Sequence, residues 1–136
     1  MNEKTILILG LGHSQKDLAV AAKEYGARVL GCAKSSDGPA RKHIDGFRRI
    51  DIFDVDALVE YAKKERVSAI YTLGLEAAIE PMATVSERLG LRTFVNVTDF
   101  EKLKNKAVWR AVLGDIPGNL EFKTASKVED LETWSR

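Results

Sequence analysis

The stretch Thr5-Ile6-Leu7-Ile8-Leu9-Gly10-Leu11-Gly12 decides the fold. Its central residues are apolar without interruption, which is typical of a strand buried on both faces of a parallel sheet. The two glycines then allow the backbone to turn tightly, and a helical pattern follows over about residues 14–25. This stretch therefore predicts the strand, turn and helix that open an α/β domain.

The rest of the chain repeats this alternation of short apolar runs and amphipathic stretches. Further strands are predicted at residues 28–33, 47–52, 69–73 and 92–95. One helix is predicted to follow Asp54, which is expected to act as its N-cap, and another is predicted at residues 80–89. A third is predicted to begin at a capping box over residues 98–101 and to break near Asn105. We therefore expect a doubly wound parallel sheet of about five strands with helices on both faces.

The alternation of strands and helices stops before the end of the chain. We expect the α/β domain to span residues 1–115, and residues 116–136 to be a linker and the start of a second domain. Four apolar side chains of this tail, Leu120, Phe122, Leu131 and Trp134, are expected to pack on the rest of that second domain.

Composition excludes several classes of protein. The 136 residues include 21 Lys and Arg against 20 Asp and Glu, a net charge of +1, which argues against nucleic acid as a partner. No apolar run approaches the roughly 18 residues of a membrane span, and the polar N-terminus lacks the features of a secretory signal. We therefore expect a cytoplasmic protein. With one cysteine and two histidines in the chain, we expect neither a disulfide nor a metal site.

The glycine-rich turn is a candidate anion site. Amide groups at the start of the following helix can bind a phosphate or a carboxylate, although an unliganded tight turn needs the same glycines. A dinucleotide fingerprint requires a third glycine where Gln15 stands, and an acid after the second strand, where Ala33 and Lys34 stand. Lys34 with Ser35 and Ser36 offers a contact for a ribose phosphate, so an NADP-binding module remains an alternative.

The end of the fourth strand supplies the second candidate. Ligands of doubly wound sheets bind outside the carboxyl ends of the strands, where Gly10, Gly12 and Glu76 all fall. Glu76 there can pair with an amine-bearing substrate, or can be a solvated carboxylate at a helix start. His13 and His43 are interpreted as loop residues and Cys32 as a packed apolar side chain.

The order of these motifs resembles the N-terminal domain of ATP-grasp ligases, the superfamily of biotin carboxylase, carbamoyl phosphate synthetase and the purine ribonucleotide ligases. The resemblance spans nearly the whole chain. It is carried by Gly10-Leu11-Gly12 with Lys16-Asp17, Asp37-Gly38-Pro39-Ala40 with Asp45, Phe53-Asp54 with Leu58, residues 70–79 with Glu76-Ala77, Glu87-Arg88-Leu89-Gly90-Leu91, Asn105-Lys106 and Gly114-Asp115-Ile116-Pro117.

The resemblance implies a Rossmann-like preATP-grasp domain and a set of functional residues. It implies substrate binding by Gly10, Gly12, His13, Ser14, Glu76 and Ala77, and a nucleotide contact by Lys106. His13 stands where several members carry a glutamate that contacts substrate, and Asn105 stands where aspartate commonly precedes the lysine.

The function implied is that of the substrate-side domain of an ATP-dependent carboxylate–amine ligase, including carbamoyl phosphate synthetase-like enzymes. Such ligases use ATP and Mg²⁺, whose binding residues lie in a further domain, so we expect this chain alone to be inactive, to contain no catalytic residue and to bind no cofactor. Its partners are then a small carboxylate or amine substrate and an ATP-grasp domain in cis or in trans, and a homodimer is allowed. The alternatives are an NAD(P)-binding module and a non-catalytic regulatory domain of the same fold.

Overall fold

The computed structural model describes residues 4–134, with side chains to residue 131. Its contacts divide the chain into two compact units, Met1–Val97 and Thr98–Arg136. None of the helices in the described part is long and apolar enough to cross a membrane.

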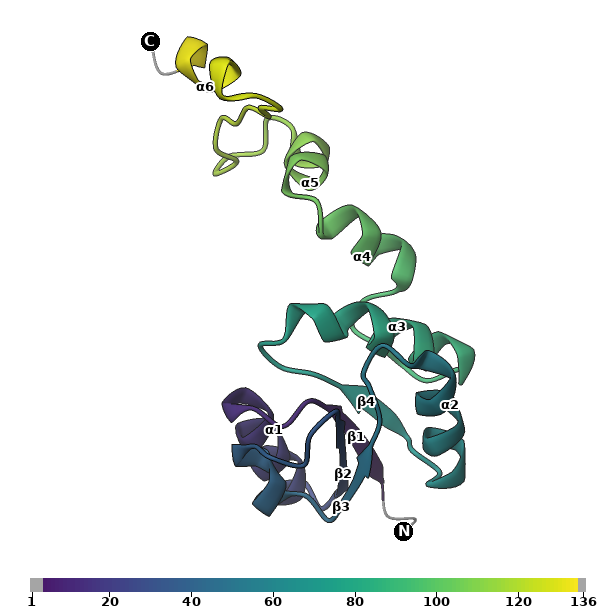
Figure 1. The fold of residues 1–136 in the computed structure, drawn as a ribbon. Helices are drawn as coiled ribbons and strands as arrows, with labels where there is room; N and C mark the ends of the chain where they lie inside the picture. The colour runs from purple at the N-terminus through teal and green to yellow at the C-terminus, as the bar shows by residue number, and fades with distance from the viewer. Residues whose placement is uncertain (1–3, 135–136) are drawn as a thin grey trace. The chain divides into compact units, whose positions relative to one another are not determined.

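The first unit is built on a four-stranded parallel sheet in the order β3-β2-β1-β4 (Figure 1). The strands are β1 (Thr5–Leu9), β2 (Arg28–Ala33), β3 (Gly46–Arg49) and β4 (Ala69–Tyr71). Leu7 of β1 stands beside Leu30 of β2 and Ile70 of β4, so the first strand lies in the middle of the sheet. This confirms the α/β class with its parallel sheet.

Helices cover both faces of the sheet, as the sequence predicts. They are α1 (His13–Glu24), α2 (Val55–Lys64) and α3 (Ile79–Arg88), with short 3₁₀ helices η1 (Pro39–His43) and η2 (Glu76–Ala78). Asp54 caps α2 as predicted, because its carboxylate accepts a hydrogen bond from the Ala57 amide. Gly26 and Gly90 follow α1 and α3 with positive φ angles.

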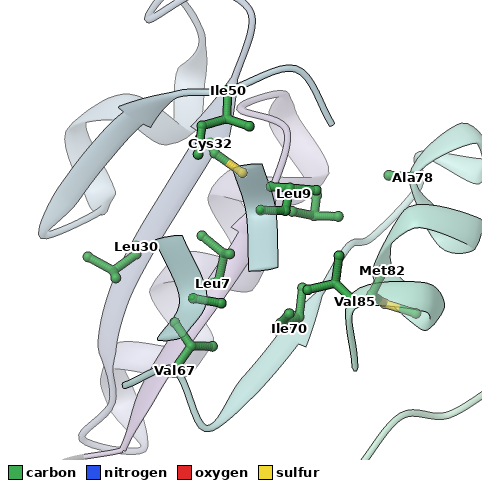
Figure 2. Close-up of a cluster of buried hydrophobic side chains, with 12 residues drawn as sticks. Leu7, Leu9, Leu30, Cys32, Ile50, Val67, Ile70, Ala78, Met82 and Val85 are labelled. Carbon is green, nitrogen blue, oxygen red and sulfur yellow. The ribbon is translucent and has the colours of Figure 1, made fainter. Parts of the chain in front are cut away.

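Alternate side chains of β1 enter two separate cores. Leu7 and Leu9 point toward α2 and α3, where they join the cluster drawn in Figure 2 with Leu30, Cys32, Ile50, Val67, Ile70, Ala78, Met82 and Val85. Ile8 points to the opposite face and packs with Ala19 of α1 and with Ala40 of η1. All three β1 side chains are fully buried, which explains why the strand is continuously apolar.

Some predicted strand bounds of the first unit are wrong, including that of the fourth strand, which ends at Tyr71 rather than at residue 73. Residues 92–95 form no strand, because the Thr93 hydroxyl bonds locally to the Val95 carbonyl oxygen at 3.0 Å and replaces ladder pairing. The third strand also ends at Arg49 rather than at residue 52. Asp51 ends it by accepting a hydrogen bond from the Phe53 amide in a local turn.

The second unit contains short helices joined by irregular backbone. They are α4 (Val97–Leu103, which begins at the last residue of the first unit), α5 (Lys106–Leu113) and α6 (Val128–Trp134). The break predicted near Asn105 is confirmed, since its side chain caps α5. The predicted capping box is wrong: α4 already begins at Val97, so Thr98 lies inside it. Leu120, Phe122 and Leu131 are exposed, and the Trp134 side chain lies outside the described residues.

Candidate functional site

The carboxyl end of β1 is held between its two neighbouring strands. The Gly10 amide donates to the Cys32 carbonyl oxygen of β2 at 2.9 Å. On the other side, the Thr72 hydroxyl, just after β4, donates to the Leu9 carbonyl oxygen at 3.2 Å. Gly10 has a φ of +92°, a conformation that strongly favours glycine and that turns the chain out of the sheet toward α1.

The start of α1 presents free backbone amides at this edge of the sheet. Gly12 is its N-cap and supplies no side-chain hydrogen bond, and the first turn holds no acidic residue. His13 and Ser14 are the first two helical residues, the imidazole exposed and the hydroxyl half-buried. Helix amides without an internal partner, together with the helix dipole, favour an anion at this position.

Gln15 joins this helix start to the loop after β4. Its Nε2 amide donates to the Leu73 carbonyl oxygen at 2.6 Å, and the residue is only 4% exposed. Its Oε1 lies 2.8 Å from the place that a Cβ on Gly12 would occupy. The position of the third dinucleotide glycine is thus filled by a side chain that ties two loops together.

The loop after β4 lies directly against the start of α1. Gly74 has a φ of +66°, and a Cβ there would lie 2.7 Å from the Ser14 hydroxyl oxygen. Glu76 and Ala77 follow at the start of η2, and both are exposed. The structure therefore brings the loop that carries Glu76 and Ala77 to the helix start that carries His13 and Ser14.

The loop between β2 and β3 completes this edge of the sheet. A Cβ on Gly38 would lie 2.4 Å from the Leu11 carbonyl oxygen, so only glycine allows this approach. The same oxygen accepts the Ala40 amide at 3.1 Å. Gly38 and Ala40, which the family resemblance singled out, therefore dock the second loop on the glycine-rich turn.

Several other candidates have structural roles. Burial raises the pKa of the Cys32 thiol to about 12, so this cysteine is a packed, protonated side chain. The Lys34 ammonium lies 3.0 Å from the Asp51 carboxylate, so the residue proposed for a ribose phosphate already has an ionic partner. The Phe53 amide and the Lys34 ammonium together lower the pKa of Asp51. His43 ends η1 on the loop between β2 and β3 and is half-buried.

Lys106 belongs to the second unit of the chain. It is the exposed first residue of α5. Asn105 before it accepts hydrogen bonds from the amides of Ala107 and Val108, at 3.0 and 3.3 Å. Asn105 is therefore the N-cap of α5, a role for which asparagine and aspartate are about equally suited. The replacement of the common aspartate by Asn105 therefore preserves the helix that carries Lys106.

Sequence reasoning missed Gln15 and Thr72 as organisers of the site. In the sequence Gln15 stands out only because it replaces a glycine, and its bond to Leu73 joins residues 58 positions apart. The apolar pattern places Thr72 in a strand and predicts no role for its hydroxyl, which is buried. The one available signal was a polar residue within an apolar pattern. In residues 4–131, no three His, Cys, Asp or Glu side chains gather where they could hold a metal ion.

Comparison with solved structures identifies the fold. The chain superposes on N5-carboxyaminoimidazole ribonucleotide synthetase from Thermotoga maritima with a TM-score of 0.76 and 21% identity, over 96% of this chain and 36% of that one. It also superposes on glycinamide-RNase-transformylase T from Mycobacterium tuberculosis with a TM-score of 0.73 and 16% identity, over 97% of this chain and 38% of that one. The chain has the Rossmann-like preATP-grasp fold. This confirms the resemblance to the N-terminal domain of ATP-grasp enzymes.

Sequence comparison finds proteins that are similar to part of this chain. The chain is 36% identical to the formate-dependent phosphoribosylglycinamide formyltransferase of Chlorobaculum tepidum over 67 residues. These residues make up 49% of this chain and 17% of the relative. Over 84 residues it is 27% identical to the protein of that name from Synechococcus sp. strain CC9902, covering 62% and 21%. The chain thus spans about a fifth of the length of these relatives, and no family model matches it. These names do not single out carbamoyl phosphate synthetase.

Proposed function

We propose that this chain is the substrate-side domain of an ATP-dependent ligase of the ATP-grasp class. The observation that carries the proposal is the meeting of two loops at the carboxyl edge of the sheet. The Gln15–Leu73 hydrogen bond and the close approach of Gly74 to Ser14 hold the free amides of α1 beside the loop of Glu76. Such an edge is where doubly wound sheets bind their ligands.

The proposed substrate is a phosphoribosylated amine of the kind named in the sequence relatives, phosphoribosylglycinamide. Its two ends suit the two sides of the site. The amides of His13 and Ser14 favour an anionic or strongly polar group, whereas the exposed carboxylate of Glu76 favours an ammonium group. A site that offers both would select a ligand that carries both kinds of group.

The phosphoryl-transfer step is proposed to depend on an ATP-grasp domain in cis or in trans. The structural relatives are about three times as long as the part that this chain matches. Transfer of a phosphoryl group requires bound Mg²⁺ and cations that neutralise developing charge. Lys106 is the residue of this chain proposed to contact the nucleotide, and the remaining groups would come from that other domain.

A calorimetric titration of the 136-residue chain with phosphoribosylglycinamide tests the substrate assignment. We expect saturable binding that Glu76→Gln weakens about tenfold, since a charge-assisted contact contributes about 1.5–3 kcal/mol. Glu24→Gln is the matched control, because Glu24 ends α1 at the opposite end from the site. The assignment is wrong if the chain does not bind this ligand, or if the two variants behave alike.

A second titration separates the proposal from the NAD(P)-binding alternative. NADPH is expected not to bind, because Gln15 fills the third glycine position and Lys34 is paired with Asp51. Saturable quenching of NADPH fluorescence would instead support the dinucleotide module. ATP with Mg²⁺ is expected to bind weakly at most and not to be hydrolysed, and turnover by this chain would contradict its assignment as the substrate-side part.

A further inference from the structure

An open cavity lies between α1 and the loop that joins β2 to β3, and its lining shares no residue with the candidate substrate site. It has a volume of about 470 Å³, within the range of about 300–1,000 Å³ that is usual for small-molecule sites. Its charged and titratable lining consists of Lys16 of α1, Asp37 of the loop, and Arg41, Lys42 and His43 of η1. The lining therefore contains three permanent cations and one carboxylate.

The carboxylate in the lining is already engaged within its own loop. Asp37 Oδ2 accepts a hydrogen bond from the Ser35 hydroxyl at 2.9 Å, and the Asp37 amide donates to the same hydroxyl oxygen at 3.1 Å. No ion pair within 4.0 Å is found for Lys16, Arg41 or Lys42 among the described side chains. The cations of this cavity are thus available to an outside anion.

The backbone that frames the cavity is packed on the core. Gly38 lies against the Leu11 carbonyl, and Ala40 and Ile44, on either side of the cationic residues, are buried in the core beneath α1. The Arg41 guanidinium lies over the Phe47 ring, 5.4 Å from its centroid, which restrains this long side chain. A preformed cationic site loses less conformational entropy on binding than one made of free surface lysines.

We propose that this cavity binds the phosphate group of a small molecule, at a site distinct from the candidate substrate site at Gly10, Gly12, His13, Ser14, Glu76 and Ala77. Arginine and lysine side chains that line one cavity suit a doubly charged oxyanion, to which arginine can donate two parallel hydrogen bonds. The excess of two positive charges matches the charge of one phosphate monoester. This site does not depend on the ligase assignment.

The experiment is an NMR titration of the full chain, following backbone amides at constant ionic strength. The probes are inorganic phosphate and ribose 5-phosphate, with sodium chloride as the reference. We expect saturable shifts with both phosphates, centred on Lys16, Gly38 and residues 41–43, and no saturable shifts with chloride. The proposal is wrong if the phosphate-induced shifts do not saturate, if chloride reproduces them, or if they centre on residues 10–14.

Charge-removal variants test whether the named side chains form the site. Arg41→Gln with Lys42→Gln is expected to weaken phosphate binding at least tenfold while leaving the amide spectrum folded. Lys63→Gln with Lys64→Gln removes the same charge from consecutive exposed residues at the end of α2 and should change the affinity less than twofold. Equal losses in both pairs would show non-specific attraction and overturn the proposal. If the first pair unfolds the chain, Lys42→Gln alone, at an exposed side chain, is expected to weaken binding at least threefold, and an unchanged affinity overturns the proposal.

Discussion

A hydrogen bond joins Gln15 of α1 to Leu73 of the loop after β4, at the edge of the sheet where the candidate site lies. The side-chain amide of Gln15 donates a 2.6 Å hydrogen bond to the Leu73 backbone carbonyl oxygen from an almost completely buried position. One side chain therefore fixes the spacing between the start of α1 and the loop of Glu76, and occupies the position where dinucleotide-binding relatives of this architecture require glycine.

The first prediction concerns this bond. Gln15→Ala leaves the Leu73 carbonyl without its side-chain donor and is expected to reduce the free energy of unfolding by about 1–3 kcal/mol. Urea denaturation followed by circular dichroism measures the loss. Asp17→Asn, at the exposed side chain two positions along α1, should change stability by less than about 0.5 kcal/mol. Equal stabilities of the two variants would show that the bond does not hold the loops together.

The second prediction concerns the contact between Gly38 and Leu11. Gly38→Ala would place a Cβ 2.4 Å from a backbone oxygen, so the loop must move, at a cost of about 2 kcal/mol or more. Gly90→Ala is the control, because its Cβ would meet nothing within 4 Å and only its positive φ is penalised. We expect Gly38→Ala to lower the melting temperature more than Gly90→Ala, and the reverse order would contradict the docking of this loop.

The third prediction is a pH dependence at Asp45. The Lys23 ammonium, at 2.6 Å, and the Val29 amide, at 2.8 Å, hold the pKa of this carboxyl below its usual value. The ionised group therefore stabilises the fold above its unfolded-state pKa, near 3.9, and this contribution is lost as the pH falls through the lower folded-state pKa. Since the side chain is 37% exposed, the contribution is below about 1 kcal/mol.

Asp45→Asn tests this linkage by urea denaturation at several pH values. The variant should be less stable than the parent at pH 7, and the difference should shrink as the pH is lowered toward about 2. A difference that stays constant over this range would show that the charge of Asp45 is not the cause.

The fourth prediction concerns the reactivity of Cys32. Its buried thiol has a pKa raised to about 12, so it is protonated at pH 8 and shielded from reagents. Reaction with a disulfide reagent is expected to be slow in the folded chain and to become fast in urea, where the thiol approaches its ordinary pKa of about 8.5. A fast reaction in native buffer would place this thiol in a reactive site instead of in the core.

The parts of the fold that depend on local pattern could be predicted. The continuously apolar residues of β1 and the two glycines after it determine a buried strand and a tight turn, and the cap at Asp54 is a local bond. The strand expected at residues 92–95 does not form, and the cause is also local: the Thr93 hydroxyl donates a hydrogen bond to the Val95 carbonyl oxygen two residues away. Apolar content alone did not reveal that the hydroxyl competes with sheet pairing.

The candidate site could be predicted only in outline. The rule that parallel strands bind ligands at their carboxyl ends placed Gly10, Gly12 and Glu76 at one edge. The contacts that organise this edge join residues far apart in the chain, such as Gln15 with Leu73 and Gly38 with Leu11. Those contacts follow from the sheet order β3-β2-β1-β4, which no local pattern specifies.

The assignment as a substrate-side domain is tested most directly by an NMR titration of the 136-residue chain with phosphoribosylglycinamide. We expect saturable shifts of the amides of residues 10–15 and 73–77, the two loops joined by the Gln15–Leu73 bond. NADPH at the same concentrations should leave these amides unmoved. Saturable shifts of the same residues with NADPH, and none with phosphoribosylglycinamide, would contradict the assignment.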